Sequence, residues 1–262
     1  MINFSKYKRM FVFGCSFTSY RWPTWADIVS REIPDVDFYN FGLCGGGNLL
    51  ISIRITEANV RYKFTTDDLI MVMWTTFCRE DRYKDNRWWM TGNIFSASHD
   101  YPEEFVRRYT DTKGYLIRDL AVITQTTAFL KTLPAASFIM ASVPYDYQQD
   151  PNDSSVREIL ELYKETTIST PPCLLDLEMN GKWENGHYYH DPACCPPGEQ
   201  FGDYHPNPLR YHNYLTRIGL PLTDKSLLYA QKSTEDLHRI KTRAELDMLF
   251  PEIKFSQSRT IL

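Results

Sequence analysis

Residues 69–74 read Leu-Ile-Met-Val-Met-Trp, six consecutive apolar residues without the apolar–polar alternation of a half-exposed strand. A run of this kind is typical of a parallel strand that is covered on both faces. Three further short segments, at 9–14, 36–41 and 137–142, also read as strands. Stretches with helical spacing separate them, so the sequence predicts an α/β protein whose parallel sheet lies between layers of helices.

Helices are predicted between and after these strands. Residues 23–33 carry three large apolar residues on one helical face before Pro34 ends the pattern. Asn48 is predicted to cap the helix that follows it, because an asparagine side chain accepts hydrogen bonds from the first helical turn. The remaining helices are predicted at 115–133, from 208 onward and within 223–250.

The composition limits the class of protein. A chain of 262 residues is long enough for one large domain, which we expect to span 1–262. The 29 basic and 33 acidic residues give a net charge of −4, which argues against a nucleic-acid partner. No apolar stretch approaches the ~18 residues of a membrane span. Without a secretion signal either, we expect a cytoplasmic protein whose six cysteines are reduced thiols.

Two insertions are predicted to interrupt the alternation of strands and helices. The first, about 79–110, is polar and aromatic without a clear period. The second, about 170–200, continues to 208 as a long loop rather than an element, and loops of that length are usually functional or disordered. Its aromatic residues favour order. A helical extension is predicted for about 223–262.

A candidate nucleophile follows the first strand. Gly14-Cys15-Ser16-Phe17-Thr18 begins where the segment 9–14 ends, and open α/β proteins place their sites at the carboxyl ends of strands. A turn there exposes the Ser16 hydroxyl and offers its backbone N–H to a developing oxyanion. Taken alone, the same motif also fits a residue that caps the next helix.

Three more motifs follow in chain order. The segment 40–48 (NFGLCGGGN) comes after the second strand, and its consecutive glycines let the backbone approach a ligand. It lacks the glycine spacing and the lysine of phosphate-binding loops, which disfavours a phosphate site. Thr75 and Thr76 follow the strand at 69–74, and Asp203-Tyr204-His205-Pro206 precedes the helix that starts near 208.

In this order the four motifs resemble those of the SGNH (GDSL-type) hydrolases, a family of flavodoxin-like esterases, lipases and carbohydrate deacetylases. The resemblance covers about 8–80 and 200–216. It implies a three-layer α/β/α sandwich with a mostly parallel central sheet. It also implies Ser16 as the nucleophile and His205 as the general base, with Asp203 orienting the imidazole.

The same resemblance implies an oxyanion hole. Its donors would be the backbone N–H groups of Ser16 and Gly45, with Thr76, or alternatively Asn48, as the third. No cofactor is implied. If these roles hold, we expect a Ser16 Oγ to His205 nitrogen distance within about 3.5 Å.

The chain departs from the family pattern at three positions. Cys15 stands where an aspartate is usual, and we expect it to be a small buried residue rather than a thiol nucleophile. Thr76 replaces an asparagine, so one oxyanion donor is weakened. Asp203 lies two residues before His205, where a spacing of three is common. These departures keep a non-catalytic binding or structural module open as an alternative.

Two further clusters have alternative interpretations. His187, His190, Cys194 and Cys195 are possible zinc ligands, but their spacing fits no usual zinc pattern, and we expect no metal. Trp88 and Trp89 would stack on a sugar or acyl group as one wall of a substrate cleft, or else bury the insertion against the sheet.

The leading hypothesis is therefore a serine hydrolase that cleaves a carbohydrate O-acetyl or small acyl ester through an acyl-enzyme. An acyltransferase that uses the same Ser16 and His205 is the other catalytic alternative. The substrate and the oligomeric state are not specified by the sequence.

Overall fold

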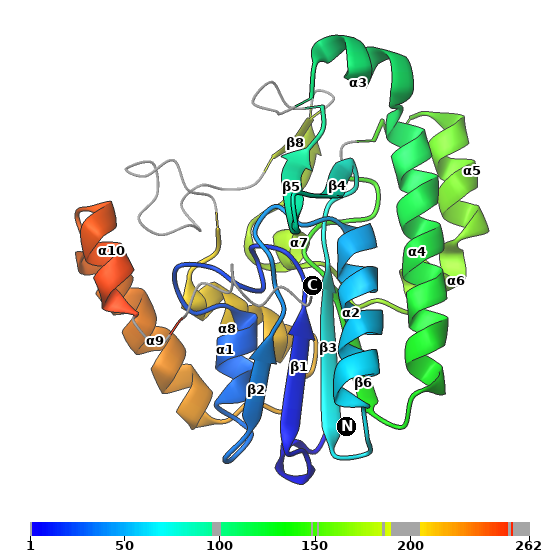
Figure 1. Cartoon of the computed structure of the whole chain (residues 1–262). Helices are drawn as coiled ribbons and strands as arrows, with labels where there is room; N and C mark the ends of the chain where they lie inside the picture. Colours follow the sequence, from blue (N-terminus) through cyan, green and yellow to red (C-terminus); the bar gives the residue numbers. More distant parts are fainter. Residues whose placement is uncertain are drawn as a thin grey trace.

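Four parallel strands form the central sheet of the computed structural model, in the order β2-β1-β3-β6 (Figure 1). They are β1 (Arg9–Phe13), β2 (Asp37–Asn40), β3 (Asp68–Trp74) and β6 (Ala136–Ala141). The structure describes residues 2–95, 101–147, 149–150, 152–184, 187–189, 205–250 and 253. The chain steps from β1 outward to β2 and then crosses back to β3. The carboxyl ends of β1 and β3 therefore meet at the switch point where open α/β sheets bind ligands.

Helices pack on both faces of this sheet, which gives the expected three-layer α/β/α arrangement (Figure 1). The described helices are α1 (Trp25–Ser30), α2 (Asn48–Tyr62), α3 (Glu103–Tyr109), α4 (Thr112–Thr132), α5 (Ser154–Leu162), α6 (Lys164–Ile168), α7 (Leu174–Glu178), α8 (Pro208–Arg217), α9 (Asp224–Arg239), α10 (Arg243–Leu249) and a 3-10 turn, η1 (Phe4–Lys6). Two antiparallel hairpins are added, β4 (Arg79–Lys84) with β5 (Arg87–Asn93) and β7 (Lys182–Glu184) with β8 (His187–Tyr189).

The core is divided by the sheet into two layers. Alternate residues of a strand point to opposite faces, so β1 contributes Phe11 and Phe13 to one layer and Met10 and Val12 to the other. The first layer is completed by α2 and α4, and the second by α1, α8 and α9. All seven residues of β3 are buried, as the apolar run at 69–74 predicts.

Side-chain caps set the starts of several helices. Thr24 and Asp27 form a reciprocal capping box at α1, and Asn207 accepts a hydrogen bond from the Arg210 N–H ahead of α8. The prediction that Asn48 caps α2 is wrong. Gly47 occupies the cap position without a side-chain bond, and Asn48 is the first helical residue, because its side chain is used in tertiary contacts described below.

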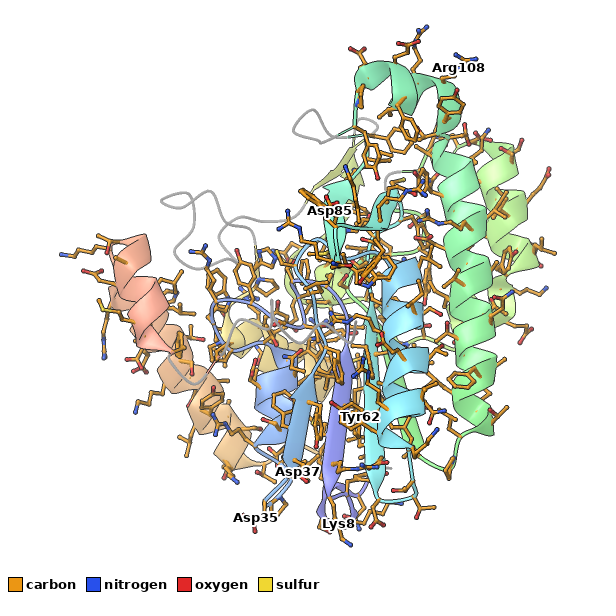
Figure 2. The ribbon with its side chains drawn as sticks, in the orientation of Figure 1. Lys8, Asp35, Asp37, Tyr62, Asp85 and Arg108 are labelled. Atoms are coloured by element: carbon orange, nitrogen blue, oxygen red, sulfur yellow. The ribbon has the colours of Figure 1, made fainter. Side chains whose placement is uncertain are left out.

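The first insertion is more regular than the sequence predicts. Residues 79–93 form the β4–β5 hairpin, whose turn residues Asp85 and Asn86 have φ angles of 53° and 60°. Two left-handed residues in a two-residue loop are typical of a type I′ turn. Figure 2 shows Asp85 toward the end of the molecule opposite Lys8 and Asp35, which lie near the amino ends of the strands.

The second insertion also differs from its prediction as a loop. Within 170–208, the described residues include α7 and the short β7–β8 hairpin, and the chain turns back between them at Asn180, whose φ is 49°. No helix in the described part of the chain is long and apolar enough to cross a membrane.

Candidate functional site

The serine loop, residues 14–20, begins where β1 ends. A side chain at Gly14 would place its Cβ 2.0 Å from the Thr18 hydroxyl, so only glycine fits. The N–H groups of Thr18 and Ser19 both donate to the Cys15 carbonyl, at 3.0 and 3.2 Å. These bonds close a tight turn that holds Ser16, 5% exposed, at the carboxyl end of the sheet. Cys15 is fully buried, as expected for a packing residue.

The glycine loop, residues 42–47, is bonded directly to the serine loop. Asn40 at the end of β2 donates from Nδ2 to the Thr18 carbonyl at 2.9 Å and accepts the Gly42 N–H at 2.9 Å. The Leu43 N–H donates to the Gly14 carbonyl at 2.9 Å. The motifs after the first and second strands therefore lie side by side, as the topology predicts.

Some backbone N–H groups of these two loops have an acceptor within the protein and others do not. Gly45 has a φ of +81°, typical of the third residue of a type II turn, and the Gly46 N–H closes that turn at 2.9 Å. The Gly47 N–H donates to the Asp81 carboxylate. Within the described residues, by contrast, the N–H groups of Ser16 and Gly45 have no protein acceptor. These are the two donors expected for an oxyanion hole.

Asn48 and Thr76 differ in how their side chains are used. The fully buried Asn48 donates from Nδ2 to the Thr75 carbonyl and to Asp119 Oδ2, both at 3.0 Å, and accepts the Thr75 N–H at 2.9 Å. Both of its amide hydrogens are thus donated within the protein. The Thr76 hydroxyl, at the end of β3, donates to the adjacent Phe77 carbonyl at 3.2 Å.

Aromatic rings of the serine loop enclose His205. Its ring stacks on Tyr20, with centroids 3.8 Å apart and planes at 16°, and lies 5.1 Å from Phe17. The buried Trp22 donates from Nε1 to the Pro206 carbonyl at 2.8 Å. The segment before α8 is therefore fixed against the residues that follow Ser16, although 184 positions separate Trp22 from Pro206 in the chain.

The proposed triad is only partly described. Asp203 lies outside the described residues, so its relation to His205 stays a prediction. The expected short distance between the Ser16 hydroxyl and the His205 ring likewise stays a prediction. The His205 ring does lie against Phe17, the residue after Ser16, and catalytic hydrogen bonds are often long before substrate binds.

Buried charges lie behind the glycine loop. Burial raises the pKa of Asp119, opposed by Arg118, whose Nε donates to it at 2.7 Å. Burial also raises the pKa of Asp81 to about 6, opposed first by the hydrogen bond from the Gly47 N–H. Asp81 thus accepts a backbone N–H, and Asp119 accepts from the side chains of Arg118 and Asn48.

The two tryptophans of the first insertion face opposite ways. Cross-strand pairs place Trp88 with Tyr83 on the hairpin face that also carries Asp81 and Met90, and place Trp89 on the other face. Met90 lies against Gly45, where an added Cβ would be 3.3 Å from the Met90 Cβ. Trp88 is therefore on the face that contacts the glycine loop.

The possible zinc ligands are mostly outside the described residues. His190, Cys194 and Cys195 lie outside the described residues, and His187 is the first residue of β8. In the part of the chain that is described, no three histidine, cysteine or acidic side chains are grouped to hold a metal ion.

Sequence reasoning missed several residues that shape this region. Tyr20 and Trp22 at His205, and Arg79 and Asp81 at the glycine loop, lie outside the recognised motifs. The turn pair Asp85-Asn86 between two short segments was a readable hairpin signal. The distant contacts themselves had no local signature.

Known proteins similar to this chain are found among solved structures. No protein-family model matches the sequence, and no curated protein matches it. Among solved structures, the chain is similar to a member of the lipolytic protein G-D-S-L family from Veillonella parvula. That match has 16% identity, covers 88% of this chain and 99% of the other, and has a TM-score of 0.38.

The chain is also similar to Axe2, an acetylxylan esterase from Geobacillus stearothermophilus. Here the identity is 14%, the coverage is 84% of this chain and 97% of the other, and the TM-score is 0.42. At these identities and TM-scores, neither match identifies the function, the substrate or the mechanism of this chain.

Proposed function

We propose that the chain is a serine esterase that acts on a carbohydrate O-acetyl or small acyl ester. The observation that carries the proposal is the meeting of three motifs at the carboxyl edge of the sheet. Ser16 lies in a tight turn, Gly45 lies in the loop bonded to that turn, and His205 stacks on Tyr20 of the same loop. The N–H groups of Ser16 and Gly45 have no acceptor within the described residues, as an oxyanion hole requires.

The proposed reaction has two steps. His205 removes the Ser16 hydroxyl proton as Oγ attacks the ester carbonyl, and the Ser16 and Gly45 N–H groups stabilise the oxyanion. The protonated imidazole then gives its proton to the departing alcohol, which leaves an acyl group on Ser16. Water, deprotonated by His205, releases the acid and restores the serine. Asp203 is proposed to orient the imidazole during both steps.

Thr76 is proposed as the third oxyanion donor in preference to Asn48, because its hydroxyl can rotate away from the adjacent Phe77 carbonyl, to which it donates at 3.2 Å. Both Asn48 amide hydrogens are already donated to Thr75 and Asp119. For the substrate wall we propose Trp88 rather than Trp89, because Trp88 shares its hairpin face with Met90 beside Gly45.

Labelling with a fluorophosphonate tests this function, because only an activated serine reacts. The wild-type protein should be labelled and should hydrolyse p-nitrophenyl acetate. Ser16→Ala and His205→Ala should each lose at least about 10³-fold of the turnover, and the double variant should lose no more. Asp203→Ala should lose less, because its role is orientation.

The matched control is Ser30→Ala, which removes a serine hydroxyl bonded to the Asp27 carbonyl on α1. It should label like the wild-type protein. Full turnover by Ser16→Ala would refute the serine mechanism, and an unlabelled wild-type protein would favour the non-catalytic alternative. Product analysis with added alcohol acceptors separates the esterase from an acyltransferase.

A further inference from the structure

The β4–β5 hairpin contacts the glycine loop at three successive residues. The Gly47 N–H donates to both carboxylate oxygens of Asp81, at 2.9 and 3.2 Å. Arg79 Nη1 donates to the Gly46 carbonyl at 2.8 Å. At Gly45, an added Cβ would lie 3.3 Å from the Met90 Cβ and 3.4 Å from the Met90 carbonyl oxygen. The hairpin thus contacts the glycine loop through the hydrogen-bonded side chains of Asp81 and Arg79 and through the packing of Met90 against Gly45.

The hairpin is itself anchored to α4. Arg118 donates from Nη2 to the Arg79 carbonyl at 2.8 Å and from Nη1 to Glu80 Oε2 at 3.0 Å. The Tyr115 hydroxyl donates to the same Glu80 oxygen at 2.8 Å. Arg118 also bonds the fully buried Asp119. A continuous set of charged hydrogen bonds therefore links the rigid α4 to the first residues of β4.

A loop with three consecutive glycines needs such support. Glycine has the largest conformational freedom in the unfolded chain and the weakest local preference in the folded one. An oxyanion donor stabilises a transition state only if it is already oriented when charge develops. In this loop the Gly46 carbonyl and the Gly47 N–H are held from outside, while the Gly45 N–H keeps no acceptor among the described residues.

We propose that Asp81 and Arg79 are positioning residues that hold the glycine loop so that the Gly45 N–H is ready for an oxyanion. The catalytic part of this inference rests on the proposed function. The first insertion is then a structural component of the active site as well as a candidate substrate wall. Neither residue touches the reacting atoms.

A purely structural role for Asp81 is the competing explanation. Its carboxylate lies at the amino end of α2, where a negative charge stabilises a helix. That role predicts a loss of stability and no specific change in turnover. The test therefore measures the loop and the reaction separately.

Hydrogen exchange of peptides covering 43–48 reports on the loop without any activity. Asp81→Ala should raise their exchange rate at least about 10-fold, and Asp81→Asn, which keeps a carbonyl acceptor for Gly47, should restore slow exchange. Lys84→Ala is the matched control, because Lys84 is an exposed residue of the same strand. It should exchange like the wild-type protein. Unchanged exchange in Asp81→Ala overturns the proposal.

Turnover and labelling then test positioning. In Asp81→Ala, kcat and the fluorophosphonate rate constant should fall about 10- to 100-fold with KM little changed, and Asp81→Asn should recover most of both. Faster exchange with wild-type kcat overturns the positioning role. If Asp81→Ala does not fold, Arg79→Met removes the donor to Gly46 and should give the same pattern. A wild-type protein that neither labels nor turns over an ester refutes the proposed function, and the exchange result still decides whether the hairpin holds the loop.

Discussion

Asn48 takes the place of a strand partner for Thr75. Its side-chain amide accepts the Thr75 N–H and donates to the Thr75 carbonyl, so it satisfies both backbone groups just beyond the end of β3. Its second amide hydrogen goes to Asp119 on α4. One buried side chain therefore joins α2, β3 and α4 directly beneath the glycine loop.

Replacing Asn48 with alanine should destabilise the protein by roughly 2–4 kcal/mol. The Thr75 N–H and the Asp119 carboxylate would lose donors or acceptors in a site without access to water, and such losses carry the full desolvation cost. Urea unfolding measures the change. Leu49→Ala, one residue on and 36% exposed, should change the free energy of unfolding by less than about 1 kcal/mol. Equal losses in the free energy of unfolding of the two variants would show that the hydrogen bonds of Asn48 do not stabilise the protein more than an exposed side chain does.

The position of Ser16 at a strand end could be predicted from its motif, whereas the role of Asn48 could not. The Gly14-x-Ser16-x-Thr18 pattern is local, and Gly14 and Thr18 contact each other within one turn. Asn48 has the composition of a helix cap, but its partners lie 27 and 71 residues away. Local propensity is overridden wherever a distant buried donor or acceptor needs a partner.

At the scale of elements, the hairpin β4–β5 has two chemically different faces. One face carries Tyr83 and Trp88, whose rings meet edge to face with centroids 5.5 Å apart. The other carries Trp89 with the Arg87 guanidinium 4.1 Å above its ring. Only the first face continues toward Met90 and the glycine loop. An uncharged sugar or acyl group fits the first face better than the basic second one.

Trp88→Ala should therefore weaken substrate binding more than Trp89→Ala. We expect KM for an acetylated oligosaccharide to rise about 3- to 10-fold in Trp88→Ala, because ring contacts contribute about 1 kcal/mol. Trp89→Ala should change it less than about 2-fold. Steady-state kinetics of both variants provide the measurement. A larger effect at Trp89, or equal effects, would contradict the assignment of faces.

The elements of the sheet could be predicted more fully than those of the insertions. Buried strands such as β3 are visible as apolar runs because both of their faces meet helices. The strands β4 and β5 are polar and half-exposed, and they are held by a turn at Asp85-Asn86 and by ion pairs to α4. Turns and ion pairs leave little periodic pattern of apolar residues in the sequence, which is why the sequence predicts no regular element in the first insertion.

At the scale of the whole molecule, burial shifts the pKa values of carboxyl groups and of a histidine in opposite directions. Burial raises the pKa of Asp81, beside α2, and of Asp27, in α1, each to about 6 from an ordinary 3.8. Burial lowers the pKa of His212, in α8, below its ordinary 6.5, with the charge of Glu32 opposing the shift. The folded state therefore favours the neutral form at each of these positions.

The consequences for stability have opposite signs as the pH falls. A carboxyl with a raised folded pKa contributes stability that is fully present below 3.8 and lost as the pH rises through about 6. A histidine with a lowered folded pKa contributes stability that is present above 6.5 and lost as the pH falls through its folded value. Between pH 7.5 and 5.5, acid should thus favour the folded state through Asp81 and disfavour it through His212.

Variants that remove one group at a time should separate these effects. The free energy of unfolding of Asp81→Asn, taken relative to that of the wild-type protein, should fall by about 1 kcal/mol between pH 7.5 and pH 5.5, because the wild-type carboxyl becomes protonated there. The free energy of unfolding of His212→Gln, relative to that of the wild-type protein, should instead rise as the pH falls, because the variant has no imidazole to protonate.

Urea unfolding at pH 7.5, 6.5 and 5.5 measures the free energy of unfolding of each protein. The values for Lys84→Ala, the control, should run parallel to those of the wild-type protein throughout. If the pH dependence of all three variants is parallel to that of the wild-type protein, burial does not shift the pKa of Asp81 or of His212. If Asp81→Asn and His212→Gln change in the same direction with pH, one of the two pKa shifts has the wrong sign.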